Sequence, residues 1–225
     1  MVYWGFEPDV CNNKNNKKRG YDDVQCGGKM DGKKIKLFKD HDKMIYAIKE
    51  EIHFTSDISA ESMEALIKKI TKIINREHEK YEGTADKLKI TLILDSGGGS
   101  VNAVLKFIDF LKITKKKYPY VTFVSVLTGL CASATTVLGS SCDVRLMTKH
   151  AHAMIHSLSS GRSGMYTHLQ SYSKFLTMLH NDLIDIYMEK CHKTREELEQ
   201  LLLCETWYSA EEYKAAGFID DIIDV

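Results

Sequence analysis

Three consecutive glycines, Gly97, Gly98 and Gly99, form the stretch of the sequence with the clearest chemical potential. They follow an alternating apolar segment at 87–94, which predicts a strand, and precede the amphipathic pattern of a helix at 101–111. Glycines in such a turn let the backbone bend sharply and lie bare of side chains. Unpaired N–H groups at the start of the helix suit a phosphate, a carboxylate or the oxyanion of a carbonyl under attack. An ordinary tight turn is the alternative.

Histidines and cysteines are the other residues that suggest chemistry. His150 and His152 lie two apart and are suited to pairing on a metal ion, but no adjoining carboxylate completes such a site. Six cysteines are spread along the chain without a C-x-x-C pair, and nothing near Cys11 and Cys26 supports a metal site or a bridge between them. With no signal peptide, we expect reduced thiols, no metal and a cytoplasmic protein.

Charge and hydropathy exclude several classes of partner. The 225 residues hold 31 basic and 31 acidic side chains, so nothing global indicates binding to nucleic acid or to an anionic membrane. The longest uncharged stretch, at 118–142, is long enough to span a bilayer, but its serines, threonines, proline and glycines favour a buried strand followed by a buried helix. We predict neither a nucleic-acid partner nor a membrane segment.

The amino-terminal segment differs from the rest of the chain. Residues 1–40 hold nine basic and six acidic side chains and are rich in asparagine, lysine and glycine. This composition predicts a polar, partly disordered extension, and its acidic residues argue against an organelle transit peptide. Trp4 and Phe6 are aromatic residues suited to docking. We expect a single domain over 41–225.

The predicted elements alternate between strands and helices. Apolar patterns predict strands at 51–55, 87–94 and 121–126, and helices over 63–74, 101–117 and 165–190, with a charged connection at 75–86. This order implies parallel strands joined by crossover helices. Small apolar residues at 130–139 predict a tightly packed helix. Short strands are predicted at 144–147, 153–155 and 218–223. Capping boxes at Thr194/Glu197 and Ser209/Glu212 predict the starts of two further helices, and Gly217 is suited to end the second of them.

Four stretches together resemble one family, the proteolytic subunit of Clp-type ATP-dependent serine peptidases. Residues 97–101 are similar to its Ser-Pro-Gly-Gly-Ser-Val segment, and 129–134 to its Gly-Gln-Ala-Ala-Ser-Met. Residues 153–156 are similar to its Val-Met-Ile-His, and 206–220 to its closing Phe-Leu-Ser-Ala…Gly-Leu-Val-Asp. The resemblance spans about 45–224 in the same order. It implies an α/β fold, the crotonase-like ββα superhelix with a protruding handle helix formed by the 165–190 segment.

The resemblance also implies a catalytic triad. It makes Ser133 the nucleophile and His156 its general base, and it places the oxyanion against the backbone N–H groups of Gly98 and Ala134. Glu205 stands where the family has the aspartate of the triad, with one additional methylene. A serine hydroxyl is a weak nucleophile until an imidazole takes its proton, and a carboxylate then stabilises the imidazolium. Taken alone, Ser133 would be a serine packed in a helix and Glu205 a surface charge.

Substrate-binding residues follow from the same resemblance. Residues 159–164 stand where the family has a glycine-rich strand that holds an extended peptide by main-chain pairing. We assign substrate binding to Ser159 and Gly161, and also to Gly97 and Gly99 of the glycine turn. Gly97 replaces a proline of the family motif.

The implied function is a self-compartmentalising serine endopeptidase that cuts unfolded polypeptides without a cofactor. The family precedent is a homo-oligomer of two stacked heptameric rings, clasped by the handle helix and fed by an AAA+ unfoldase. No Gly-x-x-x-x-Gly-Lys-Ser/Thr motif occurs in this sequence, so any ATP use belongs to a partner chain. The alternatives are a catalytically impaired structural ring subunit, a crotonase-type enzyme acting on acyl-coenzyme A, and a Ser/Lys peptidase, for which no lysine stands out.

Overall fold

A computed structural model describes residues 44–224. The expectations for the amino-terminal extension, including Trp4, Phe6, Cys11 and Cys26, lie outside the described residues. The described part contains eight strands and six helices. They are β1 (Ile45–Ile48), β2 (Glu51–Phe54), α2 (Ala60–Tyr81), β3 (Leu88–Ser96), α3 (Val101–Lys117), β4 (Val121–Ala132), α4 (Ala134–Ser140), β5 (Val144–Thr148), β6 (His152–Ile155), α5 (Tyr166–Met188), α6 (Arg195–Leu202), β7 (Thr206–Ser209), α7 (Ala210–Ala215) and β8 (Asp221–Ile223).

The strands form one branched sheet. Its main path has the order β1-β2-β3-β4-β5-β8, and every pair from β2 onward is parallel, whereas β1 is antiparallel to β2. The branch leaves from β4, whose last residues pair with β6, and β7 is antiparallel to β6. The expected α/β class with parallel strands and crossover helices is confirmed.

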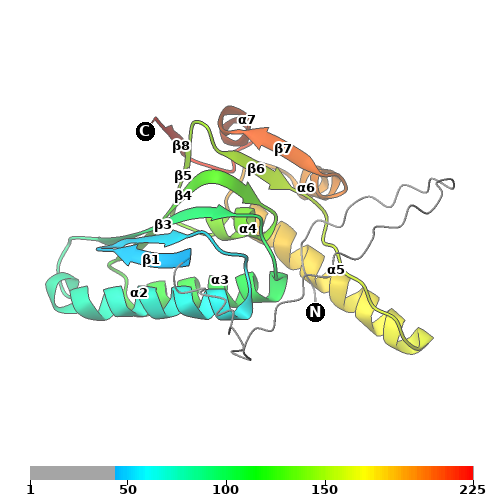
Figure 1. Ribbon diagram of the computed structural model, residues 1–225, viewed down its shortest axis with the longest axis horizontal. Helices are drawn as coiled ribbons and strands as arrows, with labels where there is room; N and C mark the ends of the chain where they lie inside the picture. Colours follow the sequence, from blue (N-terminus) through cyan, green and yellow to red (C-terminus); the bar gives the residue numbers. More distant parts are fainter. Residues whose placement is uncertain (1–43, 225) are drawn as a thin grey trace, which may run out of the picture. The chain divides into compact units, whose positions relative to one another are not determined.

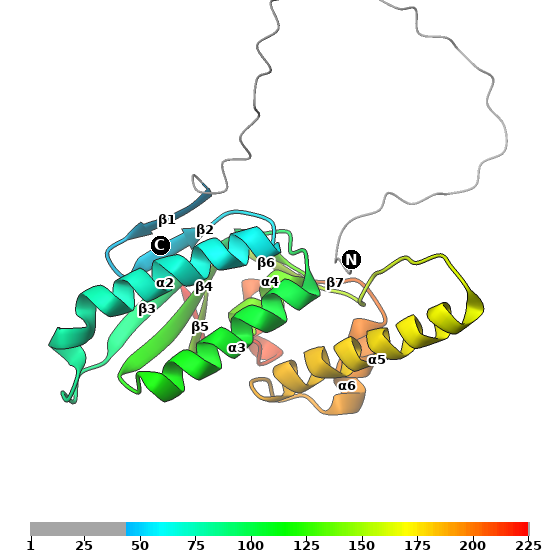
Figure 2. The ribbon, with the colours of Figure 1, turned by 90° about the horizontal axis from the view of Figure 1, so that it is seen from below.

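The helices cover the sheet in a way that explains the apolar patterns. Figures 1 and 2 show α2 and α3 side by side along one face of the sheet, while α5 projects away from it. The buried face of α2 consists of Met63, Leu66, Ile70, Ile73 and Ile74. A capping box between Ser59 and Ser62 begins this helix. The helix continues to Tyr81, so the charged connection expected from residue 75 is wrong: those charges lie on the solvent side of the helix.

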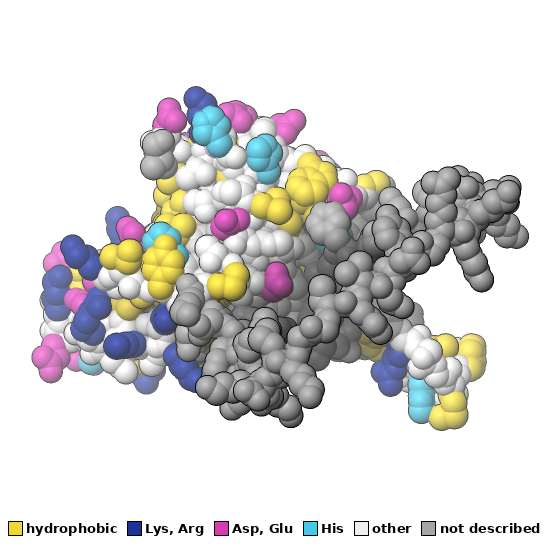
Figure 3. Space-filling model, viewed as in Figure 1, with side chains coloured by type: hydrophobic (Ala, Val, Ile, Leu, Met, Phe, Trp, Pro, Cys, Tyr) yellow, Lys and Arg dark blue, Asp and Glu magenta, His cyan; other side chains and the backbone are white. Residues whose placement is uncertain are grey.

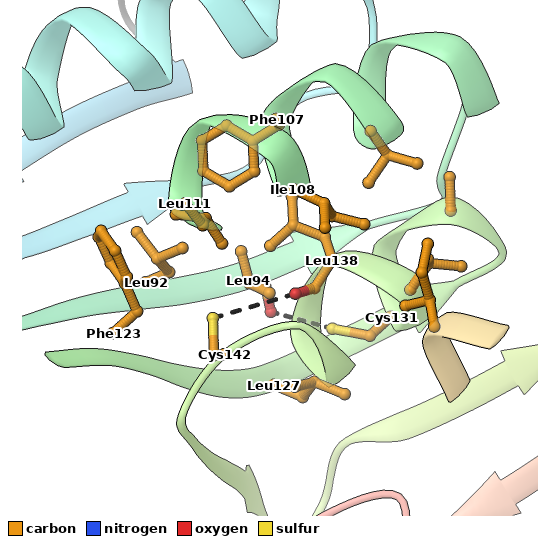
Figure 4. Close-up of a cluster of buried hydrophobic side chains, with 14 of the residues drawn as sticks. Leu92, Leu94, Phe107, Ile108, Leu111, Phe123, Leu127, Cys131, Leu138 and Cys142 are labelled. Atoms are coloured by element: carbon orange, nitrogen blue, oxygen red, sulfur yellow. Dashed lines mark hydrogen bonds between the residues drawn. The ribbon is translucent and has the colours of Figure 1, made fainter. Parts of the chain in front are cut away.

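The core between β3, β4, α3 and α4 is apolar and contains two cysteines (Figure 4). The Sγ of Cys131 donates to the carbonyl oxygen of Leu94 at 3.1 Å. Burial raises the pKa of both Cys131 and Cys142 to about 12, which keeps these thiols protonated and unreactive. The described cysteines are all free thiols.

Two local expectations need correction. The predicted helix at 130–139 begins only at Ala134, because β4 continues to Ala132 in order to pair with β6. The strand β7 at 206–209 was not predicted, since its last residue, Ser209, is also the first residue of a helical capping box. The boxes at Thr194 and Ser209 and the left-handed Gly217 are confirmed.

The outer part of α5 exposes apolar side chains. Met165, just before the helix, is 64% exposed, and on α5 Tyr166 is 73% and Met178 64% exposed. Hydrophobic side chains are visible at the projecting end of this helix in Figure 3. None of the helices in the described range is both long and apolar enough to cross a membrane.

Candidate active site

The ends of three neighbouring strands position the candidate residues. Ser96 at the end of β3 lies opposite Cys131 of β4, and Ala132 at the end of β4 lies opposite Met154 of β6. The glycine turn, Ser133 and His156 each follow one of these strands directly. Because the strands are parallel, their carboxyl ends meet at one edge of the sheet, where ligands bind in open α/β sheets. The fold thus brings together residues that are far apart in sequence, such as Gly98 and His156.

A bend in β4 creates this meeting point. Gly129 has a φ of 53°, and a Cβ there would lie 2.9 Å from Oδ1 of Asp95, so only glycine fits. The N–H of Leu130 donates to the same carboxylate oxygen at 3.1 Å. The bend lets β4 pair first with β5 and then with β6, and it directs the following turn toward the end of β6.

Ser133 occupies a strained turn between β4 and α4. Its φ of 61° and ψ of −128° are unusual for a residue with a side chain, and the residue is buried. The Ser133 N–H donates to the carbonyl oxygen of Met154 at 2.8 Å, which holds the turn against β6. Such strain persists only where surrounding structure enforces it, and it is concentrated at functional sites. A sharp strand-to-helix turn of this kind presents the nucleophile in α/β-hydrolases.

His156 is placed to accept the hydroxyl proton of Ser133. Its Nε2 lies 3.0 Å from Ser133 Oγ. Burial lowers the pKa of His156, and the negative charge of Glu205 opposes this shift without reversing it. The imidazole is therefore neutral near pH 7, the state in which a ring nitrogen can accept a proton. This pair has the geometry of a nucleophile with its general base.

Gly98 lies directly against Ser133. A Cβ at Gly98, whose φ is 102°, would lie 2.7 Å from Cβ and 3.0 Å from Oγ of Ser133. The Gly98 N–H donates to Ser96 Oγ at 3.2 Å, at the long end of the usual hydrogen-bond range. Ala134 is the first residue of α4, so its N–H is among those that a helix leaves without an internal partner.

The other glycines of the turn differ in their surroundings. A Cβ at Gly99 would lie 2.2 Å from the carbonyl oxygen of Ile58, because Ile58 pairs with this turn through two 2.7 Å backbone hydrogen bonds. A Cβ at Gly97 would meet nothing within 4 Å. Gly99 is therefore required for packing, whereas Gly97 is open to solvent, and their roles toward substrate stay predictions.

The segment expected to bind substrate has no regular structure. Residues 156–163 form neither helix nor strand, and Ser159 and Gly161 are both exposed. The predicted glycine-rich strand is thus not formed in this chain by itself. An edge strand needs a paired neighbour to be stable, and the described residues supply none here.

Glu205 lies near His156 but binds another residue. The antiparallel register pairs Ile155 with Thr206, so the next step places Glu205 opposite His156. Glu205 is exposed, and its Oε1 accepts a hydrogen bond from the indole Nε1 of Trp207 at 2.8 Å. Within residues 44–224, no hydrogen bond or ion pair joins the Glu205 carboxylate to His156.

Sequence reasoning missed two hydroxyls that support the nucleophile turn. Thr136 Oγ1 donates to the Ser133 carbonyl oxygen at 2.6 Å and lies 2.7 Å from the hydroxyl of Tyr187 on α5. All three residues are buried. The threonines of an otherwise small, apolar segment were the available signal, but nothing in the sequence indicates that Tyr187 reaches them. No group of three or more His, Cys, Asp or Glu in the described chain is arranged to hold a metal ion.

Comparisons with known proteins identify the family. A sequence model of the Clp protease family matches residues 40–225. The chain belongs to the Clp protease family. The ATP-dependent Clp protease proteolytic subunit 1 of Chlamydia trachomatis serovar D is 32% identical over 177 residues, covering 76% of this chain and 85% of the relative. The subunit of the same name from Chlamydia abortus is 33% identical over 139 residues, covering 60% and 69%.

A further relative, from Protochlamydia amoebophila, carries the same name and is 31% identical over 139 residues, 60% of this chain and 65% of its own length. The fold is accordingly the crotonase-like α/β fold of the Clp family, and α5 is its protruding handle helix. The chain is a homologue of Clp serine proteases.

Proposed function

We propose that this Clp-family protein is an active serine endopeptidase that hydrolyses unfolded polypeptides through an acyl-enzyme. The observation that supports this most strongly is the 3.0 Å approach of His156 Nε2 to Ser133 Oγ at the end of a strained turn. Ser133 would act as the nucleophile, His156 as the general base, and Glu205 as the acid of the triad. The proposed oxyanion donors are the N–H groups of Gly98 and Ala134.

The reaction proceeds in two halves. In the first, the Ser133 hydroxyl gives its proton to Nε2 of His156 while Oγ bonds to the carbonyl carbon of the peptide, whose oxygen becomes the oxyanion. The imidazolium then protonates the leaving amine as the C–N bond breaks. In the second half, His156 takes a proton from water, the hydroxide attacks the acyl-enzyme, and the proton returns to Ser133.

Peptide would bind along the exposed residues beside this edge. We assign main-chain pairing to Gly97, Gly99, Ser159 and Gly161, with little selectivity for side chains. Because the 156–163 segment has no regular structure here, an extended substrate would supply the neighbouring strand that it lacks.

The proposed assembly is a homo-oligomer of two stacked heptameric rings. The exposed apolar side chains at the outer end of α5 support a subunit interface there, because exposed apolar patches commonly mark interaction sites. An AAA+ unfoldase would deliver substrate, since the chain has no phosphate-binding motif of its own. We place the peptidase domain at 41–225 and treat 1–40 as an extension, with a cytoplasmic location.

The proposal is tested with a quenched fluorescent polypeptide that lacks stable structure. The purified protein should release fluorescence without ATP, and Ser133→Ala should not. Native mass spectrometry should count fourteen chains of 25.6 kDa in the active species. An intact assembly that releases no fluorescence, alone or with an unfoldase, would favour the structural ring subunit instead.

A further inference from the structure

The N–H of Ala134, one of the two proposed oxyanion donors, belongs to the same peptide group as the carbonyl of Ser133. A trans peptide group is planar, and its C=O and N–H point in opposite directions. Ala134 is the first residue of α4, and within residues 44–224 no hydrogen bond uses its N–H. Whatever fixes the direction of the Ser133 carbonyl therefore also fixes the direction of this free donor.

The conformational preference of Ser133 does not set this direction. A ψ of −128° at a φ of 61° lies outside the regions that are open to a residue with a side chain, so the surroundings must hold the peptide plane. Two donors of Thr136 bind the Ser133 carbonyl oxygen, the backbone N–H at 2.9 Å and Oγ1 at 2.6 Å. Both lie on the carbonyl side of the peptide group, opposite to its N–H.

Tyr187 of α5 holds the Thr136 hydroxyl in turn. The two hydroxyl oxygens lie 2.7 Å apart, and both residues are buried with Ser133. A hydroxyl has one proton and a carbonyl oxygen can only accept, so Thr136 donates to Ser133 and Tyr187 donates to Thr136. Burial raises the pKa of Tyr187, which keeps its hydroxyl protonated as a donor. The two O–H groups thus form a chain directed from α5 to the nucleophile turn.

A local hydrogen bond of this kind is common, but its second link is not. Threonine hydroxyls in helices often bond to a carbonyl three or four residues earlier. Here the accepting carbonyl belongs to a strained residue outside the helix, and a buried tyrosine from another helix supplies the second link. Thr135, the next residue toward the nucleophile, is equally buried, yet its Oγ1 has no hydrogen-bond partner in the described part of the chain. Burial of a threonine on α4 therefore does not by itself create such a chain.

We propose that Thr136 and Tyr187 are positioning residues that hold the Ser133–Ala134 peptide group with its N–H directed at the oxyanion. The inference rests on the proposed function, because it concerns a donor of the same site. Hydrogen bonds in a chain polarise one another, so the two hydroxyls also make the Ala134 N–H a stronger donor. This donor acts mainly in the transition state, when the carbonyl oxygen of the substrate becomes negatively charged. Its loss therefore lowers kcat and leaves KM unchanged.

The first test is Thr136→Val, which replaces the hydroxyl by a methyl group of similar size. With the quenched fluorescent polypeptide as substrate, we expect kcat to fall about tenfold at unchanged KM, less than the about 10²–10³-fold that loss of a whole oxyanion donor costs. Tyr187→Phe removes only the outer hydrogen bond of the chain and should lower kcat about threefold. Thr136→Ser keeps the hydroxyl and should stay within about twofold of the wild-type kcat.

Thr135→Val is the matched control. It makes the same substitution at a buried neighbour whose hydroxyl has no partner in the described residues, so kcat should change less than about twofold. Equal losses in Thr135→Val and Thr136→Val, an unchanged kcat in Thr136→Val, or a higher KM in place of a lower kcat would each overturn the inference. If Thr136→Val does not assemble, Tyr187→Phe decides by the same criteria.

A second readout does not depend on activity. The sequence contains three Ser–Ala peptides, at 59–60, 133–134 and 209–210. With ¹³C at the serine carbonyls and ¹⁵N at alanine, a TROSY-based HNCO spectrum shows these three peptide groups and no others. The carbonyl carbon of Ser133 should move to lower chemical shift in Thr136→Val, because its oxygen loses a donor. It should move less far in the same direction in Tyr187→Phe, while the other two signals stay in place as internal controls.

An unmoved Ser133 signal in either variant would overturn the inference, because the hydroxyl chain would then not act on the peptide group. A wild-type protein that releases no fluorescence would instead contradict the proposed function. The spectrum would in that case still decide whether Thr136 and Tyr187 hold the peptide group.

Discussion

The nucleophile side of the site and its acid side are built differently. Gly98, Ser133 and His156 follow the ends of three paired strands, and backbone contacts hold the glycine and the serine in place. Glu205 and residues 159–163 are exposed, and the carboxylate binds Trp207 rather than His156. The first region is positioned by the core of the subunit, whereas the second depends on side-chain rotation and on an irregular segment.

This difference shows which parts of the chemistry a single subunit can preorganise. A strained backbone turn needs a surrounding core to enforce it, and β4, β6 and α4 provide that core. A peptide-binding segment needs a neighbouring strand, which a substrate or another subunit would supply. We therefore expect substitutions on the nucleophile side to have large effects on rate and those on the acid side to have smaller effects.

The largest effect should come from the Ser133–His156 pair. Ser133→Ala, His156→Ala and the double variant should each lower kcat by about 10⁶-fold, because residues that act as a unit lose their whole contribution together. Peptide hydrolysis under saturating substrate measures this, with circular dichroism to confirm folding. Additive losses in the double variant would show that the two residues do not act together.

Gly98→Ala should have the next largest effect. The new Cβ would displace Ser133 and disturb an oxyanion donor, so we expect kcat to fall about 10⁴-fold. Gly97→Ala is the comparison variant: a Cβ there meets nothing within 4 Å, and alanine keeps the backbone N–H and carbonyl that the proposed pairing with substrate uses, so kcat should change less than about twofold. Equal losses in the two variants would contradict the placement of Gly98 against the nucleophile.

Glu205→Ala should lower kcat by about 10³-fold, less than the ~10⁴-fold that disabling a fully engaged triad acid costs. The variant also has a pH signature. Activity requires neutral His156, so it rises with pH through the pKa of this residue, which burial places below the usual histidine value. Because the Glu205 charge raises this pKa, its removal should move the rise in kcat/KM to lower pH. A shift to higher pH would contradict the electrostatic contact between the two residues.

The smallest effect concerns the exposed segment. If Gly161 holds substrate through its backbone N–H, Gly161→Pro should raise KM about fivefold with kcat unchanged, because one hydrogen bond is lost. Gly161→Ala keeps the N–H and meets no neighbouring atom within 4 Å, so its KM should stay at the wild-type value. Steady-state kinetics on one peptide distinguishes the two variants, and an equal KM in both would remove Gly161 from the substrate site.

The sequence predicted the helices and strands themselves better than the residues at which they begin and end. Periodicity identified α2, α3 and α5 because each has one strongly apolar face, and capping boxes located α6 and α7. It misplaced the start of α4, since Leu130 to Ala132 are equally suited to a buried strand and a buried helix. Only the pairing with β6, a long-range contact, decides between them.

The candidate site shows the same limit. Motif resemblance selected Ser133, His156 and Gly98, and the structure places these three together. The partner of Glu205 was not predictable, because its hydrogen bond with Trp207 depends on how two exposed side chains lie on one face of β7. The contact of Tyr187 with Thr136 likewise depends on how α5 packs on α4.

The most direct test of the central claim, that the fold activates Ser133 through His156, is covalent labelling of the intact protein by a fluorophosphonate, measured by mass spectrometry. We expect one adduct per chain, located on Ser133, absent in Ser133→Ala and formed far more slowly in His156→Ala. No adduct on the folded wild-type protein, or an adduct that persists in Ser133→Ala, would contradict the claim.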